Sequence, residues 1–293
     1  TICVNPTPTA SFTVNQNIGC APLTVNTTNN SPAPSCGQNS YLWSVSYSST
    51  AGCLPNTNGA SFINGTNASS VNPQFLFSNP GIYTISLTTI APAAACSSLV
   101  STQQITVKGK PVVSINALAP TCANQSVNPS AAVTCYINTA TTYLWSFPGG
   151  APSSATTLNP GTIVYSTPGT YTITLSVTNE CGTTTTSIPV TVNVTPSPVV
   201  PANIIVCADA TVGPLSFTSV PGATFTWTNS NTSIGLGASG SSNPIPSFVA
   251  TNATGVPITA NINVTATLSG CSSSNIFTIT VNPIPTVNVI PNQ

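Results

Sequence analysis

Hydrophobic and polar residues alternate along the chain in short runs, and one such run recurs four times. It occupies residues 2–6, 105–108, 190–193 and 279–283, and prolines follow each copy. Alternation with a period of two places one side of the run in a core, which is typical of a half-buried β-strand. Proline ends the strand because it has no N–H for the ladder. No apolar stripe of useful length has helical spacing, so the pattern predicts an all-β fold.

Two further runs recur between these strands. One carries a tryptophan between alternating apolar residues, as expected for the central strand of an immunoglobulin-like sandwich. The other is a Pro-Gly turn followed by a strand that carries a tyrosine, at residues 80–87 and 168–175. The third segment lacks this turn and has a strand over residues 260–268 in its place. The residues predicted for the cores are Trp43, Trp145, Trp227, Tyr83 and Tyr171.

The repetition predicts tandem domains of roughly 100 residues each. The fold class expected is all-β, with tandem immunoglobulin-like β-sandwiches in a rod-like array. The expected boundaries are a last strand of a preceding repeat at 1–7, repeats at 8–109, 110–196 and 197–283, and a first strand of a following repeat at 284–293. Incomplete repeats at both ends predict either a longer protein or completion by neighbouring copies.

Charge is nearly absent from the sequence. The charged side chains are Lys108, Lys110, Glu180 and Asp209, whereas about a quarter of an ordinary soluble domain is charged. Two lysines cannot replace the counterions of a nucleic acid or bind an anionic lipid surface. No apolar run approaches the ~20 residues of a membrane span. We therefore expect neither nucleic-acid binding nor membrane insertion.

The residues needed for catalysis are also missing. The chain has no histidine, which usually supplies the proton transfer near neutral pH. A glycosidase needs two facing carboxylates, and Glu180 and Asp209 fall in different repeats. Without histidine or a Cys-x-x-Cys pair, a zinc site is not expected. The sequence thus predicts a protein that is not an enzyme and has no catalytic, cofactor-binding or metal-binding residues.

Cysteine is frequent, which indicates disulfides and an oxidising, extracellular location. The first-position cysteines, Cys20, Cys122 and Cys207, precede the tryptophan strand of each repeat. The second-position cysteines, Cys96, Cys181 and Cys271, lie between its last two strands. The complete set of disulfide candidates is Cys3, Cys20, Cys36, Cys53, Cys96, Cys122, Cys135, Cys181, Cys207 and Cys271.

Two pairing schemes fit these positions. The first joins the two positions within each repeat, as Cys20–Cys96, Cys122–Cys181 and Cys207–Cys271, with Cys36–Cys53 closing an insertion. A disulfide needs Cα atoms within about 7 Å, and a strand of eight residues spans about 26 Å. If the two positions lie at opposite ends of a sandwich, a second scheme follows. It has Cys122–Cys271 between repeats, Cys20–Cys53, Cys36–Cys96 and Cys135–Cys181 within repeats, and Cys3 and Cys207 bonded to neighbours. This distance argument does not apply if the first position starts a strand beside the last strand, so both schemes remain open.

Repeats one and two resemble PKD-type immunoglobulin-like domains. They have the Cys-Ala-Pro-Leu-Thr-Val segment at 20–25, the Tyr-x-Trp strand and the Pro-Gly-x-Tyr-Thr turn in the family's order. Repeat three is similar to the PKD-like variant of giant Bacteroidota surface proteins, on segments 206–209, 225–229, 234–236 and 277–283. The resemblance covers essentially the whole chain. It implies a location outside the cell, as in gliding-motility adhesins and other cargo of the type IX secretion pathway.

One motif of the family is missing. The Asp-Phe-Gly-Asp-Gly that usually follows the tryptophan is replaced at 44–47 and 146–150, and both carboxylates are lost. A calcium or acidic site of the family is therefore not expected here.

These features predict a structural segment of a bacterial surface filament or adhesin stalk, giving length, stiffness and cell-surface adhesion. Its partners would be neighbouring repeats or copies of itself. One alternative is a carbohydrate- or surface-binding module that holds surface glycans in the insertion between Ser46 and Phe75. Another is a set of accessory domains of a secreted hydrolase.

Overall fold

The computed structural model describes residues 6–92, 97–135 and 140–285. The chain divides into two compact units, one made of residues 1–118, 128–163 and 172–189, the other of residues 119–127, 164–171 and 190–293. The regular elements of the described residues are β-strands, apart from one 3-10 turn over Thr232–Ile234. The all-β prediction is therefore confirmed. None of the described residues forms a helix long and apolar enough to cross a membrane.

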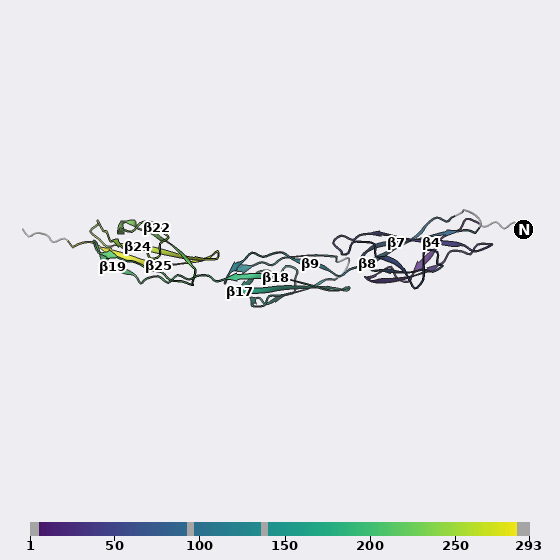
Figure 1. Ribbon diagram of the computed structural model, residues 1–293, viewed down its shortest axis with the longest axis horizontal. Coiled ribbons are helices and arrows are strands. Elements are labelled where there is room, and N and C mark those ends of the chain that lie inside the picture. Colours follow the sequence, from purple (N-terminus) through teal and green to yellow (C-terminus); the bar gives the residue numbers. More distant parts are fainter. Residues whose placement is uncertain (1–5, 93–96, 136–139, 286–293) are drawn as a thin grey trace, which may run out of the picture. The chain divides into compact units, whose positions relative to one another are not determined.

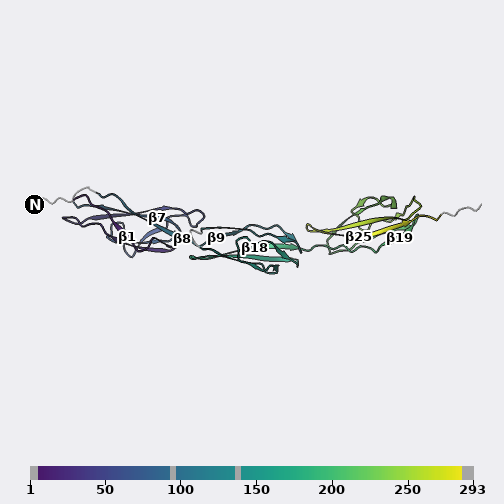
Figure 2. The ribbon, with the colours of Figure 1, turned by 180° about the vertical axis from the view of Figure 1, so that it is seen from behind.

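The first sandwich lies in the first unit and consists of two four-stranded sheets (Figure 1). One sheet has the order β1 (Phe12–Val14), β3 (Leu23–Asn29), β6 (Gln74–Phe77) and β5 (Ala60–Ile63). The other has the order β2 (Ile18–Cys20), β8 (Ser101–Lys108), β7 (Gly81–Ile90) and β4 (Ser40–Ser48). The view from behind in Figure 2 shows β1, β7 and β8 in the same part of the chain.

Alternation along the strands builds the core of this sandwich. In β7 every second residue is fully buried, including Tyr83, Ile85 and Leu87, because successive side chains point to opposite faces of a sheet. Trp43 of β4 packs edge-on against Phe12 of the opposite sheet, with ring centroids 4.9 Å apart. The tryptophan strand thus fills the middle of the sandwich as the sequence predicts.

Strands of the second sandwich are shared between the two units. In the first unit, β9 (Val112–Ile115) pairs antiparallel with β12 (Ala131–Thr134). The tryptophan strand β13 (Thr142–Ser146) pairs antiparallel with β15 (Ser154–Ala155) and with β17 (Gly169–Asn179). Chain continuity carries β17 and β18 (Gly182–Asn193) through both units. The short strands of this part are β10 (Thr121–Cys122), β11 (Ser126–Val127), β14 (Gly150–Ala151) and β16 (Ile163–Tyr165).

The third sandwich lies in the second unit. Its larger sheet has the order β19 (Ile204–Cys207), β25 (Cys271–Asn282), β24 (Ile258–Leu268), β21 (Thr224–Asn229) and β22 (Ser239–Gly240). The smaller sheet pairs β20 (Thr211–Val212) with β23 (Phe248–Val249). Trp227 of β21, Ile262 of β24 and Phe277 of β25 belong to one buried cluster. Gly240 packs on the tryptophan ring so closely that a Cβ there would lie 2.5 Å from it, so only glycine fits.

A parallel strand pair is common to all three sandwiches. The short strands β2, β10 and β19 run parallel to the last strands β8, β18 and β25, respectively. The register places Cys20 opposite Lys108, Cys122 opposite Asn193 and Cys207 opposite Asn282. Each first-position cysteine therefore lies beside the C-terminal end of the last strand of its own sandwich.

Most of the predicted core residues are buried. Trp43, Trp145, Trp227 and Tyr83 are at most 6% exposed, whereas Tyr171 is only partly buried. The prediction for Tyr171 needs correction, because this side chain keeps part of its surface exposed and its hydroxyl donates an exposed hydrogen bond to the Thr167 carbonyl (2.8 Å). Tyr165 is fully buried in its place, with the two rings stacked 4.6 Å apart.

The strands expected at the two ends of the chain lie largely outside the described residues. Residues 1–5 of the strand expected at 1–7, and residues 286–293 of the strand expected at 284–293, lie outside the described residues.

Candidate functional site: the disulfide-linked junctions

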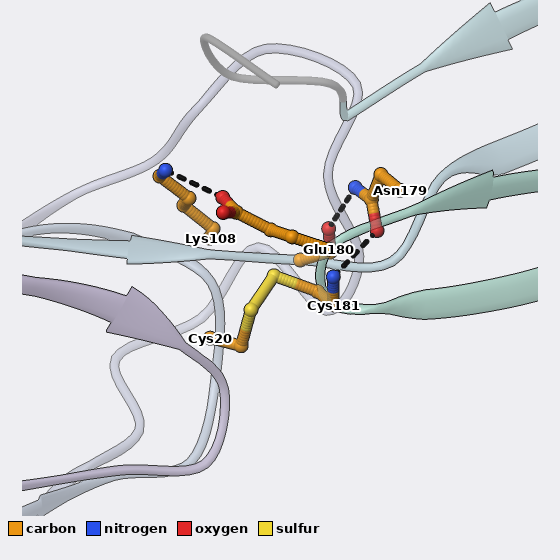
Figure 3. A network of polar contacts seen from close by, with 6 residues as sticks. Cys20, Lys108, Asn179, Glu180 and Cys181 are labelled. Carbon is orange, nitrogen blue, oxygen red and sulfur yellow. Dashed lines mark hydrogen bonds and ion pairs between the residues drawn. A yellow bond between two sulfur atoms is a disulfide. The ribbon is translucent and has the colours of Figure 1, made fainter. Parts of the chain in front are cut away.

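Two disulfides connect the first sandwich to the second, and both belong to the first unit. Cys20 of β2 bonds to Cys181, which lies in the turn between β17 and β18, with Cα atoms 5.3 Å apart (Figure 3). Cys53 bonds to Cys135, which follows β12, with Cα atoms 4.5 Å apart. Each bond crosses from one set of strands to the next, so this junction is covalently closed at two points.

Polar contacts surround the Cys20–Cys181 bond, as Figure 3 shows. The buried Asn179 amide donates a hydrogen bond to the Gly109 carbonyl (2.9 Å) of the connecting segment, and its oxygen accepts one from the Cys181 N–H (2.9 Å). Lys108 forms an ion pair with Glu180. Since the Glu180 side chain is half exposed, this pair contributes little to stability.

The insertion of the first sandwich takes part in the same junction. The cysteines of the Cys53–Cys135 bond are 2% and 3% exposed, and the Thr134 hydroxyl donates to the Gly52 carbonyl (2.8 Å) beside it. The segment between Ser46 and Phe75, expected as a binding loop, also contributes β5 to a sheet. Sequence reasoning did not identify this contact, because Cys53 and Cys135 share no repeated position.

The junction between the second and third sandwiches belongs to the second unit. Cys122 of β10 bonds to Cys271, the first residue of β25, with Cα atoms 5.7 Å apart. The Asn193 amide donates to the Ser269 carbonyl (3.1 Å) in the turn before Cys271. The connecting segment is also held, since Asn275 donates to the Pro198 carbonyl (3.2 Å) and Ser273 to the Pro196 carbonyl. The proline-rich connection is therefore hydrogen-bonded to the sandwich that follows it.

The structure corrects both pairing schemes. The pairs Cys20–Cys96, Cys122–Cys181, Cys207–Cys271 and Cys36–Cys53 of the first scheme, and Cys20–Cys53 and Cys135–Cys181 of the second, are replaced by Cys20–Cys181, Cys53–Cys135 and Cys122–Cys271. The last of these is the bond that the second scheme placed between repeats. Cys36 is disulfide-bonded, and Cys3 and Cys96 lie outside the described residues.

Parallel pairing explains why, among the described residues, a first-position cysteine does not bond to the second-position cysteine of its own sandwich. The first-position cysteine ends a short strand that lies beside the last strand and runs parallel to it. In the third sandwich, Cys207 lies opposite Asn282 at the end of β25, whereas Cys271 begins β25. About 3.3 Å per residue separates the two ends of this strand by more than 30 Å, far beyond the reach of a disulfide. Cys207 therefore cannot reach Cys271 of its own sandwich, and the described second-position cysteines, Cys181 and Cys271, bond to a neighbouring sandwich.

The junction offers little acid–base or metal chemistry. Cys20, Glu180 and Cys181 have ligand atoms within 4.8 Å of one another, but the two sulfurs are bonded to each other, and a metal needs thiolates. The second carboxylate, Asp209, belongs to the second unit. Desolvation by burial raises the pKa of Tyr83 above its ordinary value. The same cause, with Tyr171 beside it, raises the pKa of Tyr165. Both phenols therefore stay neutral, as packing groups do.

One family model and several solved structures are similar to the chain or to a part of it. The PKD domain family matches residues 108–194, and no curated protein matches the sequence. The chain is similar to the Escherichia coli adhesin FdeC (14% identity, 95% of this chain and 99% of that chain, TM-score 0.47). It is also similar to three N-terminal domains of the outer capsid protein Hoc of bacteriophage RB49 (12% identity, 95% and 100%, TM-score 0.40).

The junction disulfides are typical of proteins that mature in an oxidising, extracellular compartment. With the strands, registers and cores described above, they identify the chain as a tandem series of disulfide-linked immunoglobulin-like β-sandwiches, in which residues 108–194 match a PKD domain.

Proposed function

We propose that the chain is a non-enzymatic structural segment of an extracellular bacterial surface filament or adhesin stalk. The observation that carries this proposal is that disulfides join consecutive sandwiches. Catalysis does not require disulfides between domains. A protein that transmits force or keeps a fixed length does require them, because each disulfide closes a junction at which two domains would otherwise move.

Stiffness follows from the number of connections at each junction. Domains of one chain move relative to each other unless their interface is large and hydrophobic. Between the first two sandwiches, the chain itself, Cys20–Cys181 and Cys53–Cys135 provide three covalent connections. Each covalent connection added between two domains restricts hinge bending and twisting at their junction. Such a junction needs no large apolar interface.

Adhesion to a surface or to other copies would use the outer faces of the sheets. Hydroxyl groups there bond to each other across strands, as in Ser176–Thr185 (2.9 Å) and Thr178–Thr183 (2.8 Å) of the second sandwich. Thr265–Ser274 (2.8 Å) repeats the arrangement in the third. An uncharged face of this kind binds by hydrogen bonds and lacks the charge repulsion that keeps proteins apart.

The site of action we propose is the bacterial cell surface, and the repeats we propose are those at 8–109, 110–196 and 197–283. The resemblance of the third repeat to PKD-like domains of Bacteroidota surface proteins supports export by the type IX pathway and a role in gliding adhesion. Detection of the chain on intact cells by antibody, and its loss from a type IX secretion mutant, is the direct test of this placement.

Imaging of single molecules tests the structural role. The four substitutions Cys20→Ser, Cys181→Ser, Cys53→Ser and Cys135→Ser remove both bonds of the first junction. We expect negative-stain images of the unaltered chain to show a narrow distribution of angles between the first two sandwiches and images of the variant a broad one. Equal distributions would contradict a role in stiffness. Unchanged tryptophan fluorescence in the variant is the control for intact cores.

Glycan binding is the second candidate, because the insertion lines a small surface hollow. Its walls include Asn58, Ser61 and the partly buried Phe62, and an aromatic ring with nearby amide and hydroxyl groups suits a sugar face. A glycan array with the unaltered chain tests this role. We expect a bound glycan to be lost with Phe62→Ala and kept with Leu99→Ala, an exposed apolar control. An array without any bound glycan removes this candidate.

A further inference from the structure

The third sandwich carries the same junction geometry as the first two, but with a free thiol. Cys207 ends β19 opposite Asn282, and the Ala208 N–H donates to the Asn282 carbonyl (2.9 Å). Ala21 and Ala123 make the same hydrogen bond to Lys108 (2.8 Å) and Asn193 (2.9 Å). Cys207 is exposed and free. Three sandwiches therefore present a cysteine in one backbone setting, and in the third its sulfur is available.

The two equivalent cysteines show what this setting binds. Cys20 and Cys122 each bond to a second-position cysteine, which lies in or directly after the turn between the last two strands of the following sandwich. The residue opposite each first-position cysteine contacts the same turn. Lys108 pairs with Glu180, and Asn193 donates to Ser269.

Asn282 occupies the position of Lys108 and Asn193 in the third sandwich. Within the described part of the chain, its side chain makes no hydrogen bond, although it is only partly exposed. The third sandwich thus has both the thiol and the polar side chain opposite it. Within the described residues, neither contacts a turn of another sandwich, as the equivalent residues of the first two sandwiches do. Cys271 of the same sandwich is already bonded to Cys122, and the length of β25 separates it from Cys207.

We propose that Cys207 is a covalent coupling site that forms a disulfide with the second-position cysteine of another sandwich of this kind. The inference rests on the proposed structural role and extends it, because it names the residue through which the array continues. The two thiols release two protons and two electrons. A disulfide oxidant of the extracellular compartment, such as oxidised glutathione or a protein disulfide, accepts them and becomes a pair of thiols.

Disulfide mapping of the native material tests this proposal. Thiols are blocked with an alkylating agent before extraction, and the unreduced protein is digested with a protease that cuts after aromatic residues, since the chain holds only two Lys and Arg together. We expect Cys207 to be linked to a peptide whose cysteine lies between two Ser- and Thr-rich strands. A linked peptide found in this sequence identifies another copy of the chain, and one with a different sequence identifies a separate sandwich. An alkylated Cys207, or one that carries only a small thiol, overturns the proposal.

Two variants separate position from mere reactivity. Cys207→Ser should lower the size of the native material on non-reducing gels. The double variant Cys207→Ser/Ser241→Cys moves an exposed thiol to another loop of the same sandwich and should not restore the larger species. Restoration would show that any exposed thiol suffices, which contradicts a built site. If Cys207 proved to be free, the disulfides of the first junction would still hold that junction. Disulfide mapping therefore tests this proposal, whereas the imaging experiment tests the structural role.

Discussion

Two buried tyrosines differ in what their hydroxyl groups contact. The Tyr83 hydroxyl donates to the Asn79 carbonyl (2.9 Å) and accepts from the Gly59 N–H (3.2 Å), whereas the buried Tyr165 hydroxyl has no hydrogen-bond partner among the described residues. We expect Tyr83→Phe to lower the free energy of unfolding by about 1–3 kcal/mol, because two backbone groups lose their partner. Tyr165→Phe should leave it unchanged or raise it, because a desolvated hydroxyl is removed. Urea unfolding of both variants measures the difference.

Each variant controls for the other, because both delete one oxygen atom from a buried ring. Equal losses in the two would mean that packing of the ring, rather than hydrogen bonding, sets the cost.

The response to pH follows from the few groups that titrate. The side-chain carboxyls are Glu180 and Asp209, and there is no histidine, so few side chains change their charge between about pH 5 and pH 8. Burial raises the pKa of Tyr83 and of Tyr165 above 10.0 in the folded state. The unfolded chain therefore loses these protons first, and stability is lost as the pH rises above about 10. We expect the melting temperature to stay level through neutral pH and then fall, and a fall between pH 6 and 8 would contradict this.

At the scale of elements, the Cys122–Cys271 bond holds a short strand against the turn of the next sandwich. In the variant Cys122→Ser/Cys271→Ser we expect faster hydrogen exchange at residues 194–203 and 268–273, because the connecting segment keeps only its hydrogen bonds. Strand β24 should exchange at its former rate, since its core contacts are unaffected. Mass spectrometry of peptic fragments measures both. Faster exchange throughout β24 would mean that the bond stabilises the sandwich itself.

The sequence predicts the strands well and the disulfides poorly, for a physical reason. Burial alternates along β7, β17 and β24 as the hydrophobic pattern indicates, because a period of two is a local property. The Pro-Gly pair also predicts the turn before β7. The structure shows why glycine is needed there, since a Cβ on Gly81 would lie 2.3 Å from the Tyr47 ring. Disulfide pairing depends on the direction of a three-residue strand such as β2, and no local pattern says whether it runs parallel or antiparallel to β8.

The candidate site was correspondingly harder to predict than the fold. Repetition alone shows that Cys20, Cys122 and Cys207 occupy equivalent positions. On this basis, Cys122–Cys271 is one of the predicted alternatives. Cys53 and Cys135 occur once each, so repetition gave no signal for them. The hydrogen bond from Thr134 to Gly52 beside them joins residues 82 positions apart, which a sequence pattern cannot show.

For the whole molecule, scarcity of charge predicts how it associates. With four charged side chains, contacts between copies would depend on hydroxyl, amide and apolar groups. Salt screens charged surfaces over about 10 Å at 0.1 M, but here there is little to screen. We expect the size of assemblies, measured by light scattering, to change little between 20 mM and 500 mM sodium chloride. Dissociation by salt alone would show that Lys108, Lys110 or the carboxylates carry the contact.

The disulfides that cross the junctions also fix how far the chain can be pulled. Through the disulfides of the described residues, one covalent path from end to end runs along residues 1–53, crosses Cys53–Cys135, returns along 122–135, crosses Cys122–Cys271 and continues along 271–293. These are about 90 residues, which reach roughly 300 Å when fully extended, against about 1,000 Å for the entire backbone. Even with every sandwich unfolded, tension would reach the sulfur–sulfur bonds after less than a third of the contour length had been drawn out. The molecule would thus behave as a tether of limited extension under oxidising conditions and as one about three times longer once reduced.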